Sequence, residues 1–377
     1  MIRVLHFISD SNIGGAGRLL LHCLRHFDRD KLDVAVVLPR DSALIPSIAE
    51  TGTRYIETDC GRDASHDKGA IAAFSRIIRA EKPHIVHTHS AFDARVAAYL
   101  CGVKSRIYTR HSVFEPSRKL TAFPGKQISG FVNNTLATRI IAVADAAADN
   151  LTATGVRADK ITVILNGVEP LTPSPKEACA ALRQSLGIGE TDFVCGISAR
   201  MEPYKGHADL LAAAGTVLAK RPDVKFILMG TGSAEADLRR QAEEMGLGGS
   251  VLFTGFCSDV VPYYSIMDLS LNCSYGTEAT SLALLEAMSL GLPTAATRFG
   301  GNPGVVKDGE NGILTPIRDP AAMAEAILRI AGDAELYARL SAGAKRIFAE
   351  TFTAAAMTRQ IENVYFEEAR RCGFPMG

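Results

Sequence analysis

The sequence lacks an excess of charge, a long apolar run and a leader-like start, and each absence excludes a class of protein. Lys plus Arg and Asp plus Glu each number 41, so the net charge is zero and a nucleic-acid partner is not expected. No apolar run approaches the ~20 residues that span a bilayer, so any membrane contact is expected to be peripheral. The opening residues MIRVLHFISD have no signal-peptide layout, which predicts a cytoplasmic protein.

Paired cysteine motifs are also absent. None of the eight cysteines forms a Cys-x-x-Cys pair, and most of them lie in apolar runs. This usage is typical of a reduced protein in which cysteine serves as a small apolar side chain. Neither a disulfide framework nor a zinc site is expected.

The length and the hydrophobic pattern predict two α/β domains. A chain of 377 residues with 47% hydrophobic and 22% charged residues is globular and too long for one compact core. Apolar runs typical of buried parallel strands alternate with helical stretches in both halves. The composition is most linker-like after Asn166-Gly167-Val168, where three prolines follow within eight residues. We therefore expect two doubly wound, Rossmann-like parallel sheets facing a cleft, in domains 1–167 and 168–352.

The stretch Asn272–Thr294 carries the clearest chemical pattern. A strand ends near Asn272, and a helix capped by Thr280 or Ser281 is predicted to run through Met288. The start of a helix suits an anion such as a phosphate. Glu278 precedes the helix and Glu286 lies inside it, and carboxylates beside an anion site are suited to sugar hydroxyls. An anion beside sugar hydroxyls describes a nucleotide sugar, although a solvated acidic helix has the same spacing.

Two cations share one predicted strand-to-helix turn. Arg200 and Lys205 follow the strand Phe193–Ser198 and together can neutralise a diphosphate, Arg through a planar fork and Lys as a point charge. Cations held in advance at a departing diphosphate stabilise the transition state more than the ground state. Because these two groups can serve there, a metal ion on the diphosphate is not expected.

The first half contains a glycine turn and a group of histidines. The turn Asp10–Arg18 joins a strand to a helix, as a phosphate-binding turn does, although a plain glycine turn fits as well. His84, His87 and His89 lie around the strand Ile85–His89. A metal site is discounted because strand alternation puts only His87 and His89 on one face, with no carboxylate or cysteine close by. A hydrogen-bonding role in the cleft is expected for His89.

Residues 104–126 carry six basic residues against one acid, Glu115, with aromatic residues and prolines between them. A basic, aromatic loop of this kind could touch an anionic membrane surface or a phosphorylated acceptor. A solvated loop with a few buried aromatic residues is the alternative.

Together these residues resemble the motifs of the retaining glycosyltransferases of family 4, which have the GT-B fold. The resemblance covers nearly the whole chain and rests on Arg200 with Lys205-Gly206, Gly276-Thr277-Glu278 with Glu286, Gly14-Gly15, His111 and Asn166-Gly167-Val168. The two glutamates behind the Arg/Lys turn are its specific part. One departure is Gly17, which replaces the acid that precedes Arg18 in many relatives and leaves the acceptor side around Arg18 less determined.

The resemblance implies roles for individual residues. Arg200 and Lys205 would bind the donor diphosphate, Glu278 the hydroxyls of the donor sugar, and Glu286 the ribose. His111 would lie near the reacting carbon, and it is grouped with Arg200, Lys205 and Glu278 as catalytic. The donor site would also include Gly14, Gly15, Gly230, Phe256, Ala279, Thr280, Ser281 and Leu282, with residues 255–261 bordering the base. Arg18, His89 and His111 would face the acceptor, and a helix of about 353–377 would pack back on the first domain.

The implied activity is transfer of a sugar, with retained anomeric configuration and without a metal or other cofactor, from a nucleotide-diphosphate sugar. The donor is expected to be a UDP-sugar rather than a GDP-sugar. A glycan or lipid-linked acceptor in cell-envelope polysaccharide assembly is expected, with peripheral contact to an anionic membrane through 104–126. Two alternatives stay open: a nucleotide-sugar 2-epimerase with the same two-domain frame, and a non-catalytic nucleotide-sugar-binding protein.

Overall fold

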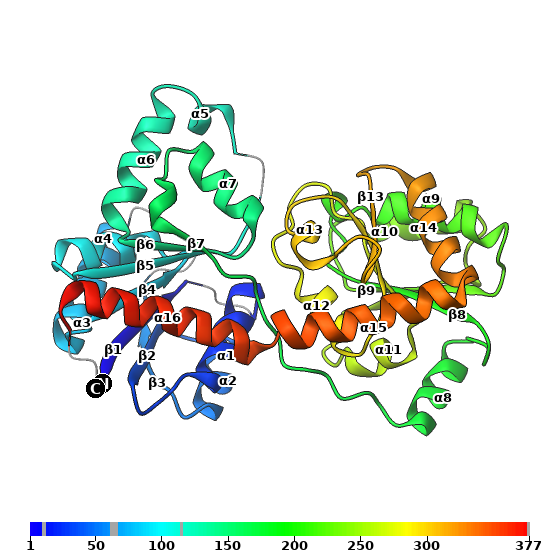
Figure 1. The fold of residues 1–377 in the computed structure, drawn as a ribbon, viewed down its shortest axis with the longest axis horizontal. Coiled ribbons are helices and arrows are strands. Elements are labelled where there is room, and N and C mark those ends of the chain that lie inside the picture. Colours follow the sequence, from blue (N-terminus) through cyan, green and yellow to red (C-terminus); the bar gives the residue numbers. More distant parts are fainter. Residues whose placement is uncertain (10–12, 61–66, 114–115, 375–377) are drawn as a thin grey trace. The chain divides into compact units, whose positions relative to one another are not determined.

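The computed structural model describes residues 1–9, 13–60, 67–113 and 116–374. The chain divides into two compact units, one formed by Met1–Val168 with Ala354–Gly377 and the other by Glu169–Thr353 (Figure 1). In the described residues, no helix is both long and apolar enough to cross a membrane.

The first unit contains a parallel sheet. Among the described residues its order is β3-β2-β1-β4-β5-β6-β7. The strands are β1 (Ile2–Ile8), β2 (Leu32–Pro39), β3 (Arg54–Thr58), β4 (Ile85–His89), β5 (Ser105–Arg110), β6 (Arg139–Ala142) and β7 (Ile161–Val163). The helices are α1 (Gly15–His26), α2 (Ile45–Glu50), α3 (Lys68–Glu81), α4 (Phe92–Leu100), α5 (Arg118–Thr121), α6 (Gly125–Leu136), α7 (Asp145–Ala153) and α16 (Ala354–Cys372).

The two faces of this sheet are covered differently. Alternate residues of β1, such as Leu5 and Phe7, pack with α3 and α4 in one apolar cluster. His6 lies between them in the strand and therefore points to the other face, where its ring contacts Phe27 and Tyr365. The last helix of the chain, α16, lies on that face beside α1.

The second unit contains another parallel sheet, whose order in the described part is β10-β9-β8-β11-β12-β13. Its strands are β8 (Phe193–Ser198), β9 (Val224–Met229), β10 (Val251–Gly255), β11 (Leu269–Asn272), β12 (Thr294–Thr297) and β13 (Gly312–Thr315). Its helices are α8 (Lys176–Ser185), α9 (His207–Leu218), α10 (Glu235–Glu244), α11 (Val261–Ile266), α12 (Leu282–Ser289), α13 (Asn302–Val305), α14 (Pro320–Gly332) and α15 (Ala334–Thr351), with a 3₁₀ turn at Pro203–Lys205.

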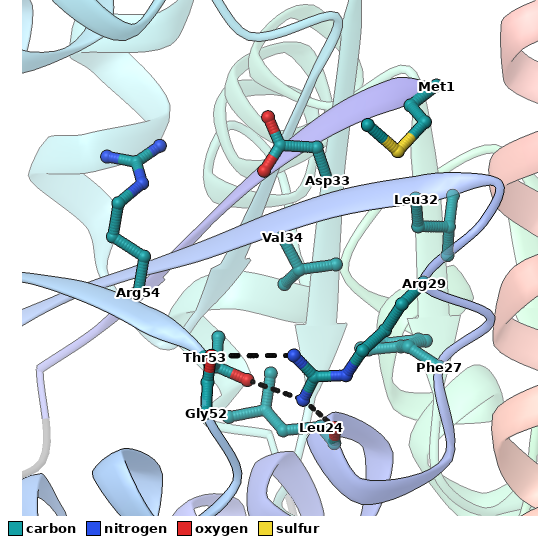
Figure 2. Close-up of a pocket in the computed structure, with 10 residues that line it drawn as sticks. All are labelled: Met1, Leu24, Phe27, Arg29, Leu32, Asp33, Val34, Gly52, Thr53 and Arg54. Carbon is teal, nitrogen blue, oxygen red and sulfur yellow. Dashed lines mark hydrogen bonds between the residues drawn. The ribbon is translucent and has the colours of Figure 1, made fainter.

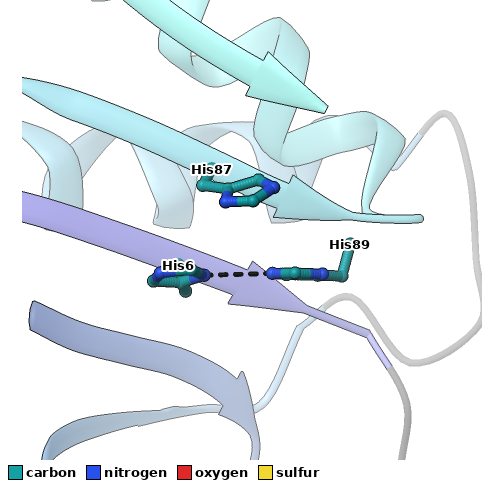
Figure 3. Close-up of side chains that lie close together, drawn as sticks. All are labelled: His6, His87 and His89. Carbon is teal, nitrogen blue, oxygen red and sulfur yellow. Dashed lines mark hydrogen bonds between the residues drawn. The ribbon is translucent and has the colours of Figure 1, made fainter. Parts of the chain in front are cut away.

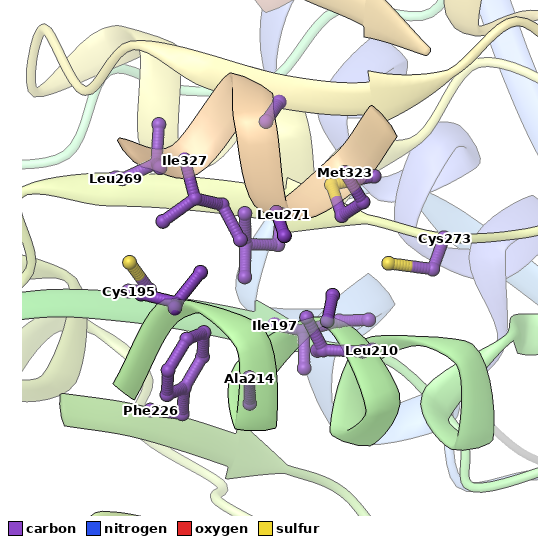
Figure 4. Close-up of a cluster of buried hydrophobic side chains, with 14 of the residues drawn as sticks. Cys195, Ile197, Leu210, Ala214, Phe226, Leu269, Leu271, Cys273, Met323 and Ile327 are labelled. Atoms are coloured by element: carbon purple, nitrogen blue, oxygen red, sulfur yellow. The ribbon is translucent and has the colours of Figure 1, made fainter. Parts of the chain in front are cut away.

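One hydrophobic cluster of this unit lies between the sheet and helices α9 and α14 (Figure 4). Phe226, Leu271 and Ile327 pack there with the thiols of Cys195 and Cys273. Burial raises the pKa of the Cys273 thiol to about 12. The predicted use of cysteine as a small apolar side chain is thus confirmed for these two residues.

The predicted fold class, two doubly wound parallel α/β sheets, is confirmed. Strand order reverses between β1 and β4 in the first sheet and between β8 and β11 in the second. Ligands of open α/β sheets bind outside the carboxyl ends of the strands at such a switch point. The residues after β8 and β11, and the histidines of β1 and β4, are therefore in the positions where a site is expected.

The predicted basic loop 104–126 is wrong in part, because it ends in two helices, α5 and the start of α6. The six basic residues of this segment also differ in their surroundings. The guanidinium of Arg106 donates to the carbonyls of Val103, Thr135 and Leu136, and so holds the end of α6. Phe114 and Glu115 lie outside the described residues.

Candidate functional site

The turn after β8 brings Lys205 to the end of β11. Gly206, which follows Lys205, has φ +75, and a Cβ there would lie 2.0 Å from the carbonyl oxygen of Cys273. Only a glycine permits both this backbone conformation and this close approach. The local sequence Lys205-Gly206 thus fixes how near the lysine comes to the loop that carries Glu278.

Lys205 and Glu278 form a buried ion pair. Nζ of Lys205 lies 2.9 Å from Oε2 of Glu278, and the two side chains are only 14% and 9% exposed. Asn272 Nδ2 and Ser274 Oγ donate to the same oxygen, at 3.0 and 2.7 Å. Three donors on one oxygen fix the orientation of the carboxylate. The other oxygen, Oε1, accepts no hydrogen bond from the described residues, which leaves it for a ligand hydroxyl.

The loop before α12 is closely packed. Ala279, Thr280 and Ser281 precede Leu282, the first helical residue, and Thr280 and Ser281 are buried. Ser281 occupies the N-cap position, as predicted, but its side chain makes no capping hydrogen bond. Instead its Oγ accepts from Asn272 at 3.4 Å.

Glu286 and Arg200 lie in different surroundings. Glu286 is buried on α12 and accepts a hydrogen bond from the Tyr264 hydroxyl at 3.3 Å. Arg200 is exposed, and its Nη2 donates to the Tyr204 hydroxyl at 3.1 Å. The structure brings Lys205 and Glu278 into contact, whereas it records no bond from Arg200 to either of them among the described residues.

Two more residues of the predicted donor site lie at strand ends. Gly230 follows β9 with φ +133, and a Cβ there would lie 2.1 Å from the carbonyl oxygen of Ala199, next to Arg200. Phe256 follows β10, and its ring is 78% exposed. An exposed ring at this position is available to a base, and its place beside the base stays a prediction.

The glycine turn of the first unit is open. Gly14 is the N-cap residue of α1, and a Cβ at Gly15 would meet no atom within 4 Å. The N–H of Arg18 donates to the Gly14 carbonyl at 3.0 Å. Packing within the protein therefore does not require a glycine at position 15. The absence of a side chain there leaves the backbone accessible to a ligand. Asp10, Ser11 and Asn12 lie outside the described residues.

Four histidines gather at the switch point of the first sheet. The strand register pairs His6 of β1 with His87 of β4, and His89 follows two residues on (Figure 3). Nδ1 of His6 lies 3.0 Å from Nε2 of His89, and Nδ1 of His89 lies 2.9 Å from Nε2 of His111. The hydrogen-bonded line thus runs from the buried strands to His111.

Tyr365 of α16 extends this line to His87. Its hydroxyl lies 3.3 Å from Nε2 of His6 and 2.6 Å from Nδ1 of His87, whose Nε2 contacts Oγ1 of Thr109 at 2.7 Å. We call the hydrogen-bonded set His111, His89, His6, Tyr365, His87 and Thr109 the histidine relay. Sequence reasoning missed His6 and Tyr365, because no pattern connects residues of a first strand and a last helix.

Burial keeps the relay neutral. It lowers the pKa of His6 to about 3 and those of His87 and His89 well below 6.5. Burial and the neighbouring Arg110 lower the pKa of His111 to about 4. Neutral imidazoles each carry one N–H, so one consistent direction of donation runs through the whole line.

The histidines could also be considered as metal ligands. One nitrogen from each of His6, His87 and His89 lies within 4.8 Å of the others. All the ring nitrogens of these three residues already take part in hydrogen bonds within the relay. A divalent ion would have to break those bonds, and no carboxylate belongs to the group to offset its charge.

An Asp-x-Asp triplet, the kind of sequence that can clamp a metal on a diphosphate, occurs once, at Asp28-Arg29-Asp30. It precedes β2, at the amino-terminal edge of the sheet. Oδ2 of Asp28 pairs with Lys31 at 2.7 Å. The Arg29 guanidinium donates to the Leu24 carbonyl and to the Thr53 hydroxyl beside a cavity of about 230 Å³ (Figure 2). None of the predicted site residues lines that cavity.

Comparison with known proteins matches each half of the chain to a glycosyltransferase family model. The model of the family described as Glycosyltransferase Family 4 matches residues 13–170, and that of Glycosyl transferases group 1 matches residues 180–347. In the solved structure of Anabaena Alr3699/HepE in complex with UDP, the fold matches with a TM-score of 0.83 at 23% identity, over 97% of this chain and all of that one.

Two curated relatives are similar in sequence. The Escherichia coli protein UDP-Gal:alpha-D-GlcNAc-diphosphoundecaprenol alpha-1,3-galactosyltransferase is 25% identical over 351 residues, 88% of each chain. The putative glycosyltransferase EpsD of Bacillus subtilis is 30% identical over 211 residues, 56% of this chain and 55% of that protein. The chain is therefore a GT-B transferase that takes a sugar from a nucleotide sugar, and it belongs to glycosyltransferase family 4, the glycosyl transferases of group 1.

Proposed function

We propose that this protein transfers a sugar from a UDP-sugar to a lipid-linked or glycan acceptor of the cell envelope, with retention and without a metal ion. The observation that carries the donor half is the buried contact of Lys205 with Glu278, which sets a cation beside a fixed carboxylate at a switch point. The choice of UDP is supported by the Anabaena structure in complex with UDP and by the name of the Escherichia coli relative.

In this proposal Lys205 and Arg200 receive the diphosphate, Glu278 binds a sugar hydroxyl through its open Oε1, and Glu286 binds the ribose. Arg200 is exposed and bonded only to a tyrosine hydroxyl among the described residues, so a ligand phosphate can recruit it at small cost. The charge that develops on the departing diphosphate is then met by groups already in place.

The acceptor half rests on the first unit. His111 stands at one end of the histidine relay, and among the described residues its Nδ1 has no hydrogen-bond partner. We propose that this nitrogen and the open backbone at Gly15 face the reacting sugar. Among the described residues of the site no side chain is an obvious nucleophile, so a phosphate oxygen of the leaving group would take the acceptor proton.

The test is a thermal-shift screen with UDP-, GDP-, ADP- and TDP-sugars. The true donor at 100 times its Kd adds ~2.7 kcal/mol to the unfolding free energy. A shift confined to UDP-sugars, lost in Lys205→Ala, is the expected result. A shift with GDP-sugars alone would contradict the choice of UDP. Donor consumption without any acceptor, yielding an epimer, would favour the epimerase alternative.

A further inference from the structure

Helix α6 turns two asparagine side chains toward the rest of the first unit. Oδ1 of Asn133 accepts from Arg95 at 2.9 Å, and Nδ2 of Asn134 donates to the carbonyl of Gly155 at 3.1 Å. A Cβ at Gly130 would lie 2.4 Å from that same carbonyl, so this face rests directly on backbone. A helix on the surface of a globular protein normally buries its apolar side and exposes its polar one. On helix α6, by contrast, Asn133 and Asn134 are half-buried while Ile128 and Phe131 are exposed.

The outward side of α5 and α6 carries four large apolar side chains. Ile128 and Phe131, one turn apart on α6, are 60% and 72% exposed. Leu120 on α5 is 44% exposed, and Phe123, between the helices, is 83% exposed. Single exposed apolar residues need no explanation, but four within residues 120–131 form a patch that marks an interaction site. Figure 1 shows α5 and α6 extending beyond the strands of their sheet.

The same surface is positively charged. Arg118, Lys119 and Lys126 are exposed between the apolar side chains. The sequence from 116 to 144 contains no Asp or Glu. Long basic side chains interleaved with aromatic and aliphatic ones are the composition of segments that lie in the head-group region of an anionic bilayer. A protein that bound this surface would need acidic side chains and an apolar groove side by side, whereas an anionic bilayer offers both charge and apolar volume.

A cavity of about 290 Å³ adjoins this surface. Leu120 lines it together with Arg95, Arg110 and Asn133. Arg95 is buried, stacked on the Tyr108 ring at 4.2 Å, and among the described residues no carboxylate pairs with it. A buried guanidinium without an acid adds to the attraction for phosphate groups next to the patch.

We propose that the α5–α6 surface, residues 117–131, docks on an anionic lipid bilayer. Leu120, Phe123, Ile128 and Phe131 enter the head-group region, and Arg118, Lys119 and Lys126 face the lipid phosphates. The surface does not overlap the donor residues, so this inference is independent of the proposed donor.

The chain contains no tryptophan, which permits a direct test. In Phe131→Trp, the single indole reports on its own surroundings. Vesicles of phosphatidylcholine with phosphatidylglycerol should shift its emission to the blue, and brominated lipid should quench it. Met245→Trp, at a 39% exposed site of the second unit, is the control and should show neither effect. An unshifted indole at 131 with anionic vesicles would overturn the proposal.

Co-sedimentation with the same vesicles measures how much the apolar side chains and the basic side chains each contribute to binding. Phe123→Ser with Phe131→Ser should weaken binding about a hundredfold, at ~10-fold for each ring. Lys119→Gln with Lys126→Gln should weaken it about 25-fold, since one basic residue contributes about fivefold, and should remove the preference for anionic lipid. Arg329→Gln, an exposed charge of the second unit, should change nothing.

These side chains are exposed, so the variants should keep the melting temperature of the parent protein. Equal vesicle binding by the parent and both double variants would overturn the proposal. So would a concentration-dependent dimer that the phenylalanine variant abolishes without any effect on vesicles, because the surface would then belong to a second copy of the chain.

Discussion

The hydroxyl of Tyr365, near the end of the chain, lies 2.6 Å from Nδ1 of His87 in the buried centre of the first sheet. The same hydroxyl lies 3.3 Å from Nε2 of His6. It thereby joins the two parts of the histidine relay, and one proton on the tyrosine sets the direction of donation along both. Through this hydroxyl the tautomer of His111 is coupled to that of His87, by a residue some 250 positions later in the sequence than His111.

Tyr365→Phe should destabilise the protein and reduce turnover. Removing the hydroxyl leaves His87 Nδ1 and His6 Nε2 buried without this partner, which costs ~1–3 kcal/mol of unfolding free energy. Because the His111 tautomer is no longer fixed, kcat should fall while KM for the donor stays unchanged. Denaturant unfolding and steady-state kinetics measure the two effects. Tyr337→Phe is the matched control, since its half-buried hydroxyl has no partner among the described residues.

The stability of the protein should fall as the pH drops below 6.5. Burial lowers the pKa of His6 to about 3 and that of His207 to about 4, whereas an unfolded histidine titrates near 6.5. Above pH 6.5 both states are neutral and these groups contribute nothing. Between pH 6.5 and 4 these two histidines take up protons only in the unfolded chain. Each fully buried histidine then lowers the unfolding free energy by about 1.4 kcal/mol per pH unit.

Melting temperatures between pH 4.5 and 7.5 test this dependence. His26→Gln, which replaces an exposed histidine, is the control variant. A melting temperature that stays constant between pH 6.5 and 4.5 would contradict burial of neutral histidines.

Lys205→Ala should reduce turnover by ~10²-fold or more, as expected when one preorganised charge-stabilising group is removed. It also leaves Glu278 with only Asn272 and Ser274 as donors to Oε2. Part of the stability loss should therefore return in Lys205→Ala with Glu278→Gln, where no charge is left alone. Lys220→Ala, at an exposed position just after α9, is the control. Near-normal kcat in Lys205→Ala would count against the proposed diphosphate site.

Gly206→Ala should destabilise the second unit more than Gly246→Ala. Both glycines have similar positive φ, +75 and +68, so both substitutions carry a backbone cost of about 1 kcal/mol. A Cβ at 206 would also meet the Cys273 carbonyl at 2.0 Å, whereas one at 246 would meet nothing within 4 Å. The extra displacement should move Lys205 and weaken donor binding in Gly206→Ala alone, as measured by calorimetry. Equal effects of the two substitutions would show that the close approach does not matter.

Chelators should leave transfer unaffected. The ring nitrogens of His6, His87 and His89 are already hydrogen-bonded, and Lys205 offers a cation at the proposed diphosphate site. Activity after dialysis against EDTA, with elemental analysis of the purified protein, measures this. Stoichiometric metal that is lost in His87→Gln would contradict the metal-independent mechanism.

The strands and the donor loop were predictable because their signals are local. A short apolar run predicted the strand Phe193–Ser198, which the structure has at the same residues. Helix α6 could not be predicted from periodicity, because Asn133 and Asn134 are half-buried and hydrogen-bonded whereas Ile128 and Phe131 are exposed. Prediction from helical periodicity assumes that the polar side of a helix faces water. On α6 that assumption fails at Asn133 and Asn134, which face other parts of the protein.

The sequence by itself determined the alternation of strands and helices, the glycines at tight approaches and the residue types of the donor loop, since each depends on neighbours along the chain. Only the tertiary structure decided that Lys205 meets Glu278 and that Tyr365 completes a line of histidines from two strands. Strand order and register bring together side chains that are 73 and 278 residues apart. No local preference encodes that pairing, because it results from which faces of the sheets are buried against which helices.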